Sequence, residues 1–206
     1  MFAAVAALPV VEEAFVKLVF TRGIEGGEAT TGWVFAEPAP DYALARTQGV
    51  RVVLLDRGYP HDVATTAPWL LQGAKTLSYA VNRAAVREAH RRGADDVLFV
   101  SSDGYLLEGS TANLLLKRGD RLITPSTSLG ILAGTTQADA FRFARSRGMT
   151  TSYELLTADA LDTADALWLV SSLRQAAPVR AVDGVPRPID TELTTAMNRY
   201  LLKRTD

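Results

Sequence analysis

The 206-residue sequence contains no cysteine and only two histidines, His61 and His90. The absence of cysteine excludes disulfides, thiolate zinc sites, iron–sulfur clusters and cysteine nucleophiles. Two histidines are too few for a multi-histidine centre, so we expect no metal site. His90 stands in the charged run REAHRR, which is typical of a solvated helix face, and a lone histidine is usually structural or exposed. A Ser-His-Asp triad is therefore not favoured.

Excess charge and long apolar runs are missing as well. Lys and Arg total 22 against 23 Asp and Glu, so the net charge is −1, without the basic surface that nucleic-acid binding requires. No stretch has the eighteen or so apolar residues of a membrane span. Residues 1–11 are apolar but lack the basic start of a signal peptide, and two glutamates follow them. We expect a cytoplasmic protein that binds neither nucleic acid nor membrane.

What is present is ordinary globular composition, with 48% hydrophobic and 22% charged residues. This length favours one domain or two small ones. Runs of β-forming residues bounded by Gly and Pro predict strands at 14–21, 30–35, 50–56, 96–101, 105–108, 113–117, 151–156 and 166–171. Apolar residues at helical spacing predict helices at 76–92, 136–147 and 191–203. The proline-containing segment 59–68 is the best linker candidate.

Four local features can carry chemistry. Lys75 precedes the first clear helix among small and apolar residues, where partial burial would lower its pKa and free the amine for Schiff-base formation. Glu108 follows an apolar strand and precedes a Gly-Ser bend. The segment GILAGTT (130–136) places small residues and hydroxyls at a helix start, which suits a phosphate. Ser171-Ser172 ends an apolar strand.

Each feature has an ordinary alternative when it is taken alone. The lysine can be solvated, the glutamate can belong to an exposed turn, and the serines can form a simple strand-end turn. Thr136, with Asp139 three residues on, has the spacing of a helix N-cap. One chemistry uses all four features together: a pyridoxal-phosphate (PLP) enzyme needs a Schiff-base lysine, an acid beside the pyridine nitrogen, and a phosphate cup.

Five stretches then carry a family resemblance, and their order and spacing match as well as their residue types. They are KTLSY (75–79), GADDV (93–97), DGYLLEGSTAN (103–113), LAGTT (132–136) and PVRAVDG (178–184). Through them residues 17–188 resemble the class IV (fold type IV) PLP-dependent enzymes, which include branched-chain and D-amino-acid aminotransferases and aminodeoxychorismate lyase. Actinobacterial aminodeoxychorismate lyases look most similar, because they share LDRG (55–58), PWL (68–70), GTTQ (134–137) and WLVSS (168–172).

The resemblance implies roles by position. Lys75 matches the catalytic lysine that forms the Schiff base and moves the Cα proton, and Glu108 matches the partner of the pyridine nitrogen. Leu132 matches the residue packed on the ring. The remaining cofactor-binding positions are Tyr79, near the cofactor tyrosine; Thr135 and Thr136, the phosphate pair; and Ser171 and Ser172, on the phosphate and substrate side. Arg22 matches an arginine that some members use near the substrate carboxylate.

Two departures from the family pattern accompany the resemblance. Members normally begin with a further N-terminal segment that carries a phosphate-binding arginine. We expect this chain to lack that segment, through a mis-called start, a fragment or a real truncation. Gln137 also replaces an arginine that many members carry.

The implied fold is α+β, D-amino-acid-aminotransferase-like. A truncated N-terminal sheet domain would cover residues 1–66 and a larger PLP-binding α+β domain residues 67–206. The implied activity is that of an aminodeoxychorismate lyase, forming 4-aminobenzoate and pyruvate in folate synthesis from a small amino substrate. The alternatives are a branched-chain or D-amino-acid aminotransferase, and a truncated, inactive fragment of such an enzyme. The family usually forms homodimers.

Overall fold

The computed structural model describes residues 2–203, and these form two compact units, up to Tyr42 and from Ala43 onward. The first unit holds α1 (Phe2–Ala6) and an antiparallel hairpin of β1 (Ala14–Thr21) and β2 (Thr31–Pro38). Runs of β-branched and aromatic residues favour these two strands, and Gly23 turns the chain with a φ of +88°. The division lies N-terminal to the boundary expected after residue 66.

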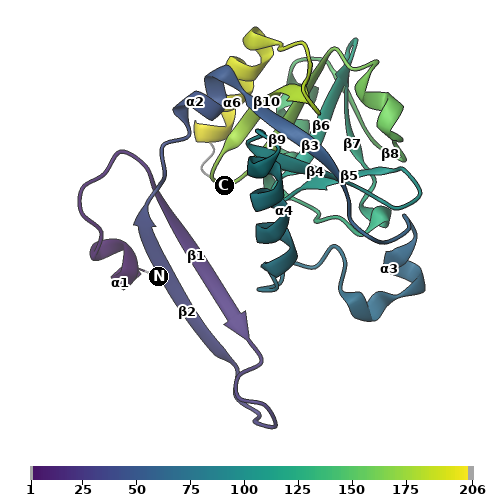
Figure 1. Ribbon diagram of the computed structural model, residues 1–206. Helices are drawn as coiled ribbons and strands as arrows, with labels where there is room; N and C mark the ends of the chain where they lie inside the picture. Colours follow the sequence, from purple (N-terminus) through teal and green to yellow (C-terminus); the bar gives the residue numbers. More distant parts are fainter. Residues whose placement is uncertain (1, 204–206) are drawn as a thin grey trace. The chain divides into compact units, whose positions relative to one another are not determined.

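The second unit is built on a nine-stranded mixed sheet in the order β5-β4-β3-β10-β9-β6-β7-β8, with β11 paired to β10 (Figure 1). The strands are β3 (Val50–Asp56), β4 (Asp96–Val100), β5 (Leu106–Gly109), β6 (Asn113–Arg118), β7 (Arg121–Pro125), β8 (Thr150–Glu154), β9 (Ala166–Ser171), β10 (Gln175–Val182) and β11 (Val185–Pro186). Because β3 pairs in parallel with both β4 and β10, it belongs to this sheet and not to the N-terminal hairpin.

Helices accompany the sheet. They are α2 (Ala43–Gln48), α3 (Val63–Thr66), α4 (Ala80–Arg91), α5 (Thr135–Ser146) and α6 (Thr191–Lys203), with short 3-10 turns at Pro68–Leu70, Thr127–Leu129 and Ala158–Leu161. Contacts join α4 to β3 and β4, and join α5 to β8, β9 and α6 (Figure 1). The segment expected as a linker, 59–68, thus contains α3 and the start of a 3-10 turn.

The core lies on both faces of the sheet, as β9 shows. Leu167 and Leu169 enter one apolar cluster, whereas Trp168 and Val170 enter another beside α5 and α6. Side chains alternate across a strand, so a continuous apolar run predicts burial on both faces. All four side chains are at most 1% exposed.

Several predicted elements differ in extent, and some were missed. The helix expected at 76–92 begins only at Ala80, which leaves Lys75 in a loop. Strands β7, β10 and β11 were not predicted. Strand β10 contains Pro178, which argues against a central strand, but its pairing with β3 is irregular between Val179 and Ala181. Pro178 itself lies where the pairing of β10 with β9 ends, opposite Trp168, and just before the pairing with β3 begins at Val179.

Candidate active site

One cavity of about 480 Å³ lies in the larger unit, where four segments of the chain converge. They are the loop before α4, the end of β5 with the turn after it, the start of α5, and the end of β9. The register explains part of this convergence, because Asn113 of β6 pairs with Val170 of β9. Eight predicted site residues line the cavity: Lys75, Tyr79, Glu108, Leu132, Thr135, Thr136, Ser171 and Ser172.

Arg22 is the predicted site residue that this cavity does not include. It is exposed and follows β1 in the N-terminal unit, and it is not among the cavity-lining residues of the described chain. Its expected role near a substrate carboxylate therefore stays a prediction.

Glu108 is the half-buried acid of the cavity. Its Oε2 accepts hydrogen bonds from the backbone N–H of Leu132 at 3.2 Å and from Nδ2 of Asn113 at 3.3 Å. Burial raises the pKa of Glu108 to about 7, against the opposing effects of the Leu132 N–H and the charges of Arg57 and Lys75. A carboxyl poised near neutrality in a cavity is typical of a functional group.

Asn113 connects the acid to the start of α5. Its Nδ2 also donates to the carbonyl oxygen of Leu132, at 2.7 Å. A Cβ at Gly134 would lie 1.9 Å from Oδ1 of Asn113, so any other residue at that position would force the Asn113 side chain to move. Asn113 ends the DGYLLEGSTAN stretch, but the sequence indicated no role for it. Nothing in its local sequence shows that it bridges two loops.

Helix α5 begins at Thr135, and Gly134 occupies its N-cap. The expectation that Thr136 caps this helix is wrong: Thr136 is the second helical residue and is buried. The first turn of a helix presents N–H groups that the helix itself does not pair, and its dipole favours negative charge. Because Thr135 and Thr136 both line the cavity, this end of it suits an anion.

Lys75 lies in the loop before α4, and its side chain is exposed. The sequence left partial burial and exposure to solvent both open for this lysine, and the structure shows exposure, because α4 begins five residues later. Tyr79 occupies the N-cap position of α4 and is half-buried. Lysine and tyrosine thus approach the cavity from the same loop.

Arg57 is a cavity-lining residue that the sequence did not single out as a site residue. Its guanidinium lies over the ring of Phe99, 4.7 Å from the centroid, and its Nη1 is buried without a hydrogen-bond partner among the described residues. A buried donor without a partner is costly, so this atom is suited to a ligand oxygen. The only sequence signal was its place in the LDRG stretch at 55–58.

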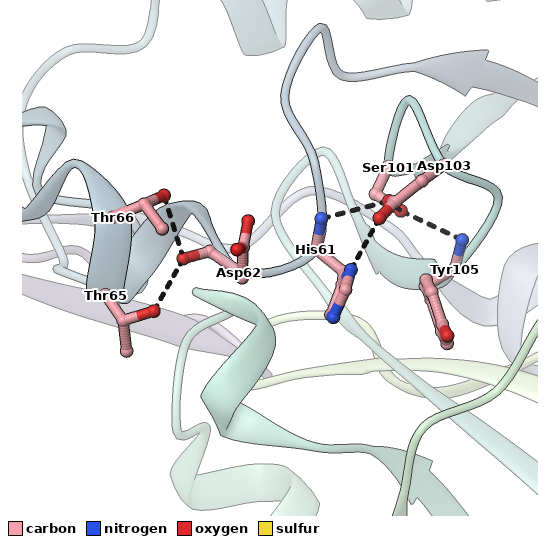
Figure 2. A network of polar contacts seen from close by, with 7 residues as sticks. All are labelled: His61, Asp62, Thr65, Thr66, Ser101, Asp103 and Tyr105. Atoms are coloured by element: carbon pink, nitrogen blue, oxygen red, sulfur yellow. Dashed lines mark hydrogen bonds and ion pairs between the residues drawn. The ribbon is translucent and has the colours of Figure 1, made fainter.

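The segment that carries Arg57 is anchored by a polar network on its C-terminal side (Figure 2). The ring Nδ1 of His61 contacts Asp103 Oδ2 at 2.5 Å, and the hydroxyl of Ser101 donates to Asp103 Oδ1 at 2.6 Å. The hydroxyl of Ser101 and then His61 hold the pKa of Asp103 down, at about 2. Ser101 donates to the carboxylate and not to the imidazole, so this cluster is not a nucleophilic triad.

The sequence profile of the amino-transferase class IV family matches residues 3–182. The chain belongs to this family. Among curated class IV relatives, it is 44% identical over 181 residues to the bifunctional aminodeoxychorismate lyase / D-amino acid transaminase of Mycobacterium tuberculosis. That alignment covers 84% of this chain and 63% of the relative, so the chain spans less than two thirds of that protein's length.

Solved class IV structures agree with this assignment. A fold IV transaminase from Curtobacterium pusillum is 58% identical, with a TM-score of 0.90 over 94% of this chain and 64% of that chain. A PLP-bound aminotransferase from Mycobacterium tuberculosis is 42% identical, with a TM-score of 0.84 over 92% and 68%. The fold is therefore the α+β fold of the fold type IV enzymes, as the sequence predicted. No helix in residues 2–203 is long and apolar enough to cross a membrane, and no acidic or histidine cluster there could hold a metal ion.

Proposed function

We propose that this cavity binds PLP and that the chain is an aminodeoxychorismate lyase, releasing pyruvate and 4-aminobenzoate. One observation carries the proposal. A lysine, an acid with a pKa of about 7 and the start of α5 line the same cavity. These are the three groups that PLP chemistry requires of a protein.

Three features of the cavity fit that cofactor. The first turn of α5 and the hydroxyls of Thr135 and Thr136 suit its phosphate. Nη1 of Arg57, which has no hydrogen-bond partner in residues 2–203, can donate to one of the cofactor's oxygens. Gly134 adds no side chain at the start of α5, where a Cβ would collide with Oδ1 of Asn113. Leu132 would pack on the ring, and Ser171 and Ser172 would complete the phosphate and substrate side.

When bound, the cofactor ring withdraws electrons from the substrate Cα. In the proposed mechanism Lys75 would be the residue that attaches the cofactor, and its Nζ, when free, would take the proton from the substrate Cα. Glu108 would accept a hydrogen bond from the ring nitrogen and so favour the protonated form of that nitrogen. Tyr79, from the same loop as the lysine, would orient the ring. Arg22 would bind a substrate carboxylate.

A transaminase is the second candidate, since a relative 58% identical to this chain carries that name and the Mycobacterium tuberculosis relative combines both activities. Both reactions need the same lysine and acid and the same Cα proton transfer. Pyruvate release from aminodeoxychorismate without a keto-acid acceptor would identify the lyase. Turnover of D-alanine or a branched-chain amino acid only with an acceptor would identify the transaminase.

The first experiment is cofactor labelling. Purified protein is incubated with PLP, its visible band is recorded, and the adduct is reduced with borohydride and mapped by mass spectrometry. Label on Lys75 is the expected result. No band, or label scattered over surface lysines, would overturn the proposal and favour the third candidate, an inactive chain that retains only the family fold. Light scattering in the same preparation tests the expected homodimer.

A further inference from the structure

Asp96 is a buried carboxylate at the first position of β4 that does not line the cavity. Its Oδ2 forms an ion pair with Nη1 of Arg174 at 2.8 Å, with side chains 2% and 18% exposed. Its Oδ1 accepts the hydroxyl of Ser110 at 2.7 Å and the N–H of Val97 at 2.8 Å. One carboxylate therefore joins three separate parts of the chain.

Two of those parts are walls of the cavity. Ser110 lines it directly, two residues after Glu108. Arg174 stands in the turn between β9 and β10, just after the cavity-lining pair Ser171 and Ser172. Its backbone N–H donates to Oγ of Ser171 at 3.2 Å. The ion pair thus connects the acid-bearing wall to the hydroxyl-bearing wall.

Side-chain hydrogen bonds restrain the backbone of the turn itself. Gln175 has a φ of +59°, unusual for a side-chain-bearing residue, and its Nε2 donates to the carbonyl oxygen of Ser172 at 2.7 Å. Arg46 donates to the carbonyl oxygens of Leu173 at 3.1 Å and Arg174 at 3.3 Å. With its backbone held in this way, the turn is positioned against β4 through the side chain of Arg174.

We infer that the Asp96–Arg174 pair positions Ser171 and Ser172 for the phosphate group of the cofactor. This inference rests on the proposed function. Hydrogen bonds to an anion are short and weaken steeply when donors move. A buried ion pair resists movement, because breaking it leaves a desolvated charge. Arg174 and Asp96 are positioning residues, since neither lines the cavity.

The test compares affinity for PLP with affinity for pyridoxal, which lacks the phosphate. In Arg174→Gln we expect the preference for PLP over pyridoxal to fall about tenfold, the loss of roughly one hydrogen bond to a charged group. Arg174→Lys keeps the charge and should restore most of the preference. The matched control is Arg51→Gln, which breaks the exposed pair with the neighbouring Asp95 and should leave the preference unchanged.

The outcomes separate this inference from the proposed function. A preference in Arg174→Gln within twofold of the wild-type value overturns the inference and leaves the proposed function standing. If that variant does not fold, Asp96→Asn/Arg174→Gln, which replaces both charges with amides, is judged by the same criterion. If wild type and Arg51→Gln bind neither compound, the proposed function fails, and the inference fails with it.

Discussion

Glu108→Gln tests whether the acid of the cavity is destabilising when ionised. Burial raises the pKa of Glu108 from 4.5 to about 7 in the folded chain. Between those values the folded protein holds a proton that the unfolded chain has released. The resulting stability is fully present below about pH 4.5 and is lost as the pH rises through about 7. At about 1.4 kcal/mol per pKa unit, the loss reaches roughly 3 kcal/mol as an upper limit.

The measurement is urea unfolding of the cofactor-free protein, followed by circular dichroism from pH 5 to pH 8. Glutamine cannot ionise, so Glu108→Gln should gain stability over the wild type as the pH rises, by roughly 2–3 kcal/mol at pH 8. Glu28→Gln changes an exposed glutamate in the hairpin loop and serves as the control. A gap that stays constant with pH, or that opens equally in Glu28→Gln, would refute the reasoning.

Three further predictions use the same material. Lys75→Arg keeps the charge but should abolish the borohydride label, with Tm unchanged because Lys75 is exposed; retained label would show that another lysine reacts. Gly134→Ala forces a Cβ onto Oδ1 of Asn113. We expect the free energy of unfolding to fall by about 1–3 kcal/mol and PLP binding to weaken roughly tenfold. Wild-type values in both the urea titration and the PLP titration would contradict this prediction. Thr194→Val removes the acceptor of the Trp168 indole N–H, which donates to Oγ1 of Thr194 at 2.8 Å. That buried N–H is left without a partner, so we expect the free energy of unfolding to fall by about 1–3 kcal/mol. An unchanged urea midpoint would rule this out.

The elements that could be predicted are those whose residues decide their own conformation. Helix α6 spans 191–203 as predicted, because its apolar residues repeat at helical spacing and Asp190 accepts the N–H of Leu193 at 2.9 Å. Strand β3 spans 50–56 as predicted, because Gly49, at a φ of +79°, ends the preceding helix. Strand β10 was missed because its pairing with β3 depends on a distant partner, and Pro178 masks the local pattern.

The same distinction applies to the candidate site. Glu108 and the start of α5 lie in short motifs, so their chemistry can be predicted from residues close in sequence. Arg57 and Asn113 act across loops: Arg57 through a buried Nη1, Asn113 through Leu132. No spacing rule identifies such residues before the strands are in register. The exposure of Lys75 was one of two alternatives that the sequence left open, because it depends on where α4 begins.

Asp95 and Asp96 show where sequence reasoning stops. The two carboxylates are adjacent and chemically identical, yet Asp95 pairs with Arg51 at the surface while Asp96 pairs with Arg174 in the interior. Strand alternation says only that they face opposite ways. Which of them is buried depends on the sheet order, which brings a turn 78 residues away onto β4. An exposed pair contributes little, whereas a buried ion that loses its partner is strongly destabilising. The same substitution of the two arginine partners is therefore expected to cost little stability at Arg51 and much at Arg174, and only the long-range topology tells the two pairs apart.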